Sequence, residues 1–149
     1  MKILFATDHA GFELKQKLVP FVQSLGYEVE DMGDLKLDPQ DDYPKFVIPL
    51  ALRISEKPDS YIGIILGGSG QGEAMVANRF PGVRATVYYV HNLEIIRVSK
   101  EDNDANILSL GARFLTEDQA KEAIQIWLHT SFSDEERHER RIQMMDNIM

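Results

Sequence analysis

A single carboxylate, Glu73, stands directly behind a glycine-rich turn near the middle of the chain. The stretch reads Ile62-Gly-Ile-Ile-Leu-Gly-Gly-Ser-Gly-Gln-Gly-Glu73. An apolar run bounded by glycines is typical of a buried parallel strand, and a helix is predicted to begin near Gln71. Glycines let a backbone approach a ligand closely, and the first N–H groups of a helix attract an anion. A carboxylate at this point could act as a general base beside an oxyanion hole.

Glu73 also has a purely structural interpretation. A carboxylate in a first helical turn stabilises the helix dipole by about 0.3–1 kcal/mol. The turn is not a dinucleotide-binding fingerprint, because it follows the third predicted strand and its spacing differs from G-x-G-x-x-G. It is not a P-loop either, because no Lys-Ser/Thr pair follows the glycines. The residues alone leave both interpretations of Glu73 open.

Other charged residues lie where ligands commonly bind. Asp8 and His9 end the first predicted strand, and Arg113 follows the last one. The alternative for Asp8 is a helix N-cap, with His9 a satisfied neighbour. Three arginines share one face of the final predicted helix and could clamp a phosphate, or could equally pair with neighbouring glutamates on a solvated face: Arg137, Arg140 and Arg141.

Composition limits the classes of function. The chain has 149 residues, 44% hydrophobic and 27% charged, which predicts one globular domain over residues 1–149. A net charge of -8 disfavours nucleic acid and anionic membranes as partners. No cysteine is present, which excludes disulfides, thiolate metal sites and a cysteine nucleophile. With no signal peptide at its start, the chain is expected to be cytoplasmic, and its histidine spacing predicts no metal site.

Predicted strands alternate with predicted helices along the chain. The strands are expected at 2–7, 27–30, 62–66, 83–89 and 106–110, and the helices at 12–25, from 44, from 71, at 93–99, at 116–128 and from 133. Thr116-Glu-Asp-Gln119 and Ser133-Asp-Glu-Glu136 both resemble capping boxes. The pattern predicts a doubly wound α/β fold with five parallel strands in the flavodoxin-like order 2-1-3-4-5 and an extra C-terminal helix. In that order Asp8-His9 lies beside the glycine turn.

Seven motifs together resemble one known family, the type B ribose-5-phosphate isomerases, which includes the galactose-6-phosphate isomerase subunits. The motifs are Asp8-His-Ala-Gly-Phe-Glu-Leu-Lys15, Asp42-Tyr-Pro44, Gly67-Gly-Ser-Gly-Gln-Gly-Glu73, Ala77-Asn-Arg79, Asn103-Asp-Ala-Asn106, Gly111-Ala-Arg113 and Arg137-His-Glu-Arg-Arg141. The resemblance implies an aldose–ketose isomerase that works through a cis-enediolate, without metal or other cofactor. It also implies a homodimer or a tetramer with active sites shared between protomers.

The resemblance implies a role for each site residue. One branch of the family uses a cysteine at the position of Gly67 as the base, and another uses a glutamate at the position of Glu73, which this chain has. Ser69 and the turn glycines would stabilise the enediolate, with Asn103 contributed by the partner. The remaining residues would contact the phosphate or the sugar: Asp8, His9, Tyr43, Gly67, Gly68, Gly70, Gly72, Arg113, Arg137 and Arg141.

One position departs from the family pattern. Asp102 replaces a histidine that is thought to help open the furanose ring. An ionised aspartate can accept a proton but does not readily donate one at neutral pH. The expected substrate is ribose 5-phosphate, and the alternatives are a hexose 6-phosphate, an open-chain tetrose phosphate, or a non-catalytic sugar-phosphate-binding subunit. A nucleotide- or flavin-binding module is a more distant alternative.

Overall fold

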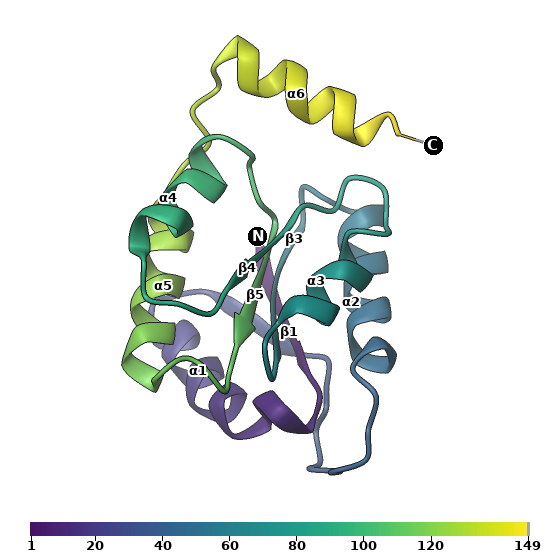
Figure 1. Ribbon diagram of the computed structural model, residues 1–149, viewed down its shortest axis with the longest axis vertical. Helices are drawn as coiled ribbons and strands as arrows, with labels where there is room; N and C mark the ends of the chain where they lie inside the picture. Colours follow the sequence, from purple (N-terminus) through teal and green to yellow (C-terminus); the bar gives the residue numbers. More distant parts are fainter. Residues whose placement is uncertain (149) are drawn as a thin grey trace.

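We describe residues 1–148 of the chain from a computed structural model, in which a five-stranded parallel sheet lies between two layers of helices (Figure 1). The strands are β1 (Lys2–Thr7), β2 (Glu28–Asp31), β3 (Tyr61–Gly67), β4 (Ala85–Tyr88) and β5 (Ile107–Gly111). The helices are the short 3-10 helix η1 (His9–Gly11), α1 (Phe12–Ser24), α2 (Pro44–Glu56), α3 (Gln71–Ala77), α4 (Leu93–Glu101), α5 (Glu117–His129) and α6 (Glu136–Asp146).

Each central strand buries side chains on both faces of the sheet. Successive residues of a strand point to opposite sides, so Ile3 and Phe5 belong to one apolar cluster and Leu4 and Ala6 to the other. The first cluster is completed by side chains of α1, α4 and α5, and the second by side chains of α2 and α3. This arrangement confirms the predicted doubly wound architecture.

The predicted order of the last two strands is wrong. The sheet runs β2-β1-β3-β5-β4, so β5 lies between β3 and β4. Every residue of β5 is buried, whereas three of the four residues of β4 are only partly buried. A strand with neighbours on both sides needs a continuous apolar run, which Ile107-Leu-Ser-Leu110 supplies better than Ala85-Thr-Val-Tyr88.

The two predicted capping boxes have different outcomes. The box at Thr116 is confirmed, because its side chain accepts from the Gln119 N–H and the Gln119 side chain accepts from the Thr116 N–H. The box at Ser133 is wrong, because Asp134 has a left-handed backbone (φ 56) and α6 begins only at Glu136. Ser133 Oγ instead lies 2.9 Å from His138 Nδ1.

Within residues 1–148, every helix falls short of the length and apolarity needed to cross a bilayer. Helix α6 lies apart from the sheet and its two helix layers. It crosses the end of the sheet opposite the glycine turn that follows β3 (Figure 1).

Candidate active site

The glycine turn is fixed by hydrogen bonds to the segment that leaves β5. The Gly67 carbonyl accepts from the Ala112 N–H at 2.8 Å, and the Gly68 carbonyl accepts from the Arg113 N–H at 3.1 Å. Gly70 has a left-handed backbone (φ 76), which favours glycine, and its carbonyl accepts from Ser109 Oγ at 2.7 Å. The predicted ligand turn is therefore a rigid element at the carboxyl end of the sheet.

Glu73 is buried beneath this turn. It lies in the first turn of α3 and is only 4% exposed. A Cβ atom added to Gly67 would overlap the Glu73 carboxylate, so the absence of a side chain at Gly67 makes room for that group. Burial raises the pKa of Glu73, its backbone N–H opposes the shift, and the charge of Asp8 adds to it. A surface carboxylate that only stabilised the helix dipole would not be buried in this way.

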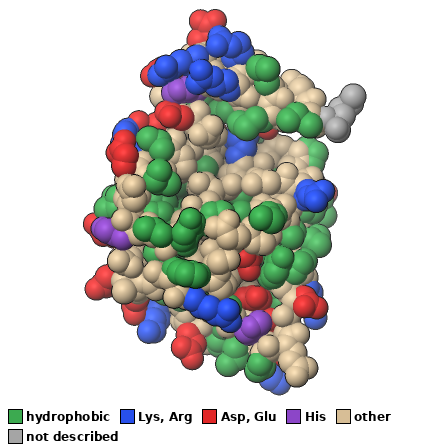
Figure 2. All heavy atoms as spheres, viewed as in Figure 1, with side chains coloured by type: hydrophobic (Ala, Val, Ile, Leu, Met, Phe, Trp, Pro, Cys, Tyr) green, Lys and Arg blue, Asp and Glu red, His purple; other side chains and the backbone are tan. Residues whose placement is uncertain are grey.

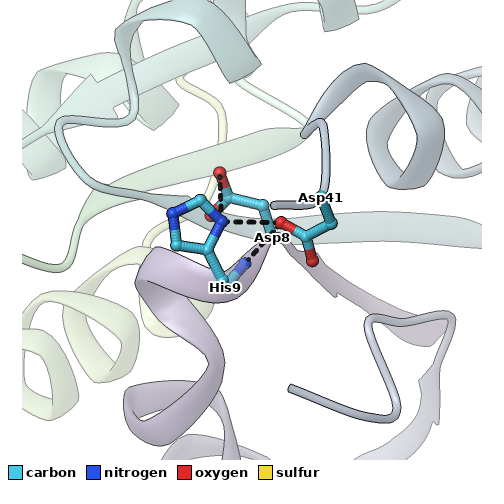
Figure 3. Close-up of side chains that lie close together, drawn as sticks. All are labelled: Asp8, His9 and Asp41. Carbon is cyan, nitrogen blue, oxygen red and sulfur yellow. Dashed lines mark hydrogen bonds and ion pairs between the residues drawn. The ribbon is translucent and has the colours of Figure 1, made fainter. Parts of the chain in front are cut away.

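Asp8 and His9 lie next to Glu73 at the end of β1. Asp8 accepts from the Ala10 N–H at 2.9 Å, so its predicted capping role is real, and burial raises its pKa. His9 Nδ1 lies 2.7 Å from Asp41 Oδ1, as Figure 3 shows. The hydrogen bond to Asp41 raises the pKa of His9 above its ordinary value, against the effect of burial.

Two further predicted residues reach the turn from other segments. The Arg113 guanidinium packs against Gly68, where an added Cβ would lie 3.0 Å from Nη1. The Tyr43 hydroxyl packs against Gly72 so closely that a Cβ there would overlap it. Ser69 Oγ accepts from the Gln71 N–H at 3.3 Å, at the start of α3. One chain thus brings together Asp8, His9, Tyr43, Ser69, the turn glycines, Glu73 and Arg113.

The remaining predicted residues lie at the other end of the sheet. Asp102 caps the C-terminus of α4, and Asn103 follows it, both ahead of the first residue of β5. Arg137 and Arg141 are exposed on α6, where Figure 2 shows a group of blue side chains. Arg137 Nε donates to Glu135 Oε2 at 2.8 Å, so its predicted pairing with a neighbouring glutamate occurs. These four residues, Asp102, Asn103, Arg137 and Arg141, form a second group that does not lie near Glu73 of the same chain.

A cavity of about 700 Å³ lies beside this second group and away from Glu73. Asn103, the 78–86 segment and the end of α6 line it, and Figure 2 shows the hollow between α6 and the rest of the molecule. Both ends of the sheet therefore carry part of the predicted site.

The sequence interpretation missed two residues that the structure places in these groups. Asp41 pairs with His9, and its only signal was its place in the acidic loop ahead of Tyr43. His138 is buried and its Nε2 lies 3.7 Å from Asp102 Oδ1. Asp8, His9 and Asp41 each offer one possible metal-ligating atom within 4.8 Å of the others, but the hydrogen bond between His9 and Asp41 already occupies two of these atoms.

The profile of the ribose/galactose isomerase family matches residues 3–145. The chain belongs to this family. Ribose-5-phosphate isomerase B of Mycolicibacterium paratuberculosis is 37% identical over 97% of this chain and 89% of that protein. This confirms the resemblance drawn from the motifs and the expected enzyme class, an aldose–ketose isomerase.

Solved structures of family members have the same fold. Ribose-5-phosphate isomerase B from Mycoplasma genitalium, determined with bound ribulose 5-phosphate, superposes with a TM-score of 0.92 at 30% identity, covering 97% of this chain and 93% of that one. The Clostridium thermocellum enzyme gives a TM-score of 0.90 at 37% identity, covering 98% and 95%. The fold described above is thus that of this isomerase family.

Proposed function

We propose that this protein interconverts an aldose phosphate and a ketose phosphate, with ribose 5-phosphate and ribulose 5-phosphate as the preferred pair. The observation that carries the proposal is the buried Glu73 carboxylate under the turn at Gly67, with its raised pKa. General bases tuned toward neutral pH by burial are typical of sites that remove protons from carbon. The names of the relatives supply the substrate class.

In the proposed mechanism, Glu73 acts on the open-chain sugar. It removes the C2 proton, the electron pair forms the C1–C2 double bond, and the carbonyl oxygen becomes the enediolate oxygen. Backbone N–H groups of the turn and Ser69 Oγ stabilise that oxygen; one such donor contributes about 10²–10³ in rate in other enzymes. Glu73 then returns the proton to C1 while the hydroxyl proton on O2 passes to O1, which leaves a hydroxyl at C1 and a carbonyl at C2. No proton is lost and no external redox partner takes part.

The basic side chains predicted to hold the phosphate are divided between the two groups of residues. His9 and Arg113 lie beside Glu73, whereas Arg137 and Arg141 are on α6 at the other end of the sheet. We therefore propose a homodimer in which α6 and Asn103 of one protomer complete the site around Glu73 of its partner. The cavity lined by Asn103 and the end of α6 and the exposed arginines of α6 support this arrangement.

Asp102 favours a second candidate function. It stands where the family pattern has the histidine thought to open the ring, and its Oδ1 lies 3.7 Å from His138 Nε2. An open-chain tetrose phosphate needs no ring opening, so an isomerase of that substrate is the alternative. A hexose 6-phosphate isomerase and a non-catalytic binding subunit remain the further alternatives for the same site.

A substrate panel tests these proposals. We would measure kcat/KM for C4, C5 and C6 aldose and ketose phosphates with wild type and with Asp102→His. The proposal predicts the highest wild-type value for the C5 pair. A higher value for the C4 pair would select the tetrose phosphate, and turnover of none, with sugar phosphates still binding, would select the binding subunit.

A further inference from the structure

The contact between His9 and Asp41 joins two segments that are far apart in the sequence. Asp41 Oδ1 accepts from the His9 backbone N–H at 3.0 Å and lies 2.7 Å from the ring Nδ1 (Figure 3). The Asp41 side chain is only 5% exposed, and its second oxygen, Oδ2, has no hydrogen-bond partner among the described residues. A buried carboxylate with one unpaired oxygen is costly unless a positive charge lies beside it. The His9 ring is the group placed to supply that charge.

The geometry also determines which nitrogen of the ring can bind a ligand. Because Nδ1 faces Asp41, the proton on Nδ1 is held there, and Nε2 points away from Asp41 (Figure 3). The His9 side chain is 30% exposed, so part of the ring can be reached by a ligand. Proteins commonly orient an imidazole in this way: a carboxylate binds one ring nitrogen, and this fixes the direction of the other.

Three charged groups face the ring from different elements. Asp41 comes from the loop before α2, Asp8 from the end of β1, with Oδ2 4.0 Å from Nδ1, and Arg113 from the segment after β5. Asp41 and Asp8 raise the pKa of His9 and Arg113 lowers it, with the Asp41 hydrogen bond as the largest effect. Burial raises the pKa of Asp41 itself, but the hydrogen bonds from the His9 ring and backbone, with a smaller effect of the neighbouring Asp34 side chain, outweigh burial and lower it.

We propose that Asp41 is a positioning residue: it keeps the His9 ring charged and aims Nε2–H at an anionic oxygen of the substrate phosphate. Arg113 then binds the same phosphate from the other side. This inference depends on the proposed function for the identity of the ligand, but the state of the His9 ring can be measured without it. Asp41 touches no substrate atom and acts only through His9.

Three variants separate charge, position and loop effects. Asp41→Asn keeps an oxygen that can accept both hydrogen bonds but removes the charge, and Asp41→Ala removes both. Asp38→Asn is the matched control, because Asp38 lies in the same loop, is exposed, and its side chain accepts from the Gln40 N–H through an oxygen that asparagine retains. For each protein we would follow the His9 ring signal by NMR from pH 5 to 9, with His91 and His129 as internal references. We would also measure KM, kcat and the Kd of inorganic phosphate across that range.

The expected result is a lower titration midpoint for His9 in Asp41→Asn than in wild type. At pH 8 the KM of this variant should be about tenfold higher, the size expected for the loss of one hydrogen bond to a charged group, with kcat within about twofold. The ratio of variant to wild-type KM should shrink as the pH is lowered, because the ring of the variant then becomes charged as well; the substrate's own ionisation cancels in this ratio. Asp41→Ala should lower kcat as well, and Asp38→Asn should match wild type.

Two results would overturn the inference. One is an unchanged His9 midpoint in Asp41→Asn, and the other is a lowered midpoint with no change in KM or in the Kd of inorganic phosphate at pH 8. Failure of the proposed function gives a different pattern: no sugar phosphate turns over, while the Kd of inorganic phosphate still depends on Asp41 and on pH.

Discussion

Replacing Gly67 by alanine should inactivate the enzyme by moving Glu73. Gly67 is not among the glycines with a positive φ, so its backbone accepts alanine. The new methyl group, however, would overlap the Glu73 carboxylate, and ordinary van der Waals separation is 3.4–4 Å. The carboxylate must therefore shift by more than about 1 Å, a displacement that typically costs about 100-fold in rate. This corresponds to about 2.7 kcal/mol in the activation barrier.

A double-mutant cycle tests this reasoning. We would measure kcat for Gly67→Ala, Glu73→Ala and the double variant on the preferred sugar phosphate. Once the carboxylate is absent, the methyl group has nothing to displace, so Gly67→Ala should change the residual kcat of Glu73→Ala by less than about twofold. A further loss near 100-fold in the double variant would refute the explanation, because the methyl group would then act on something other than Glu73.

Gly63→Ala is the control for the fold. Gly63 lies in the same strand, β3, and its Cβ would lie 2.8 Å from Leu50 Cδ2 and 3.0 Å from Ile54 Cδ1. Overpacking of this kind costs about 1–3 kcal/mol of stability. We expect a lower urea midpoint for Gly63→Ala with kcat retained. For Gly67→Ala we expect a loss of kcat with the urea midpoint retained.

The site leads to three further predictions. Because burial raises the pKa of Glu73 and the base must be ionised, kcat should fall with decreasing pH at a higher pH than an ordinary carboxyl would give. The same raised pKa means that folding loses stability as pH rises through it, so Glu73→Gln should gain stability over wild type at pH 8 but not at pH 4, by urea unfolding. If sites are shared, mixing Glu73→Gln and Arg137→Ala chains should restore about a quarter of wild-type activity, since half of the dimers then hold one intact site; additive background activity alone would contradict sharing.

The layers and most of the site could be predicted from the sequence because they follow from local patterns. The glycine run predicted both the turn and the closeness of a carboxylate, and the ends of β1 and β3 meet because parallel neighbours share an edge. The order of β4 and β5 could not be predicted in the same way. It depends on which strand has neighbours on both sides, and the signal for this is only that Ile107-Leu-Ser-Leu110 is more apolar than Ala85-Thr-Val-Tyr88.

Other features depend on contacts that no short pattern contains. The pairing of His9 with Asp41 spans 32 positions through an irregular loop, and it was not predicted. The prediction of a capping box at Ser133 was wrong because the residue types of a four-residue motif do not show that Asp134 adopts a left-handed backbone. The family resemblance implied that Asn103 comes from a partner, but the residue pattern alone did not place Asn103 and Arg137 at the end of the sheet opposite Glu73.

The most direct test of the account is kcat for Glu73→Gln on the preferred sugar phosphate. Glutamine keeps the size of the side chain and removes its ability to take a proton. Loss of a general base predicts a fall in kcat of about 10²–10⁴, with KM within a few-fold of wild type. A kcat close to that of wild type would contradict the assignment of Glu73 as the base.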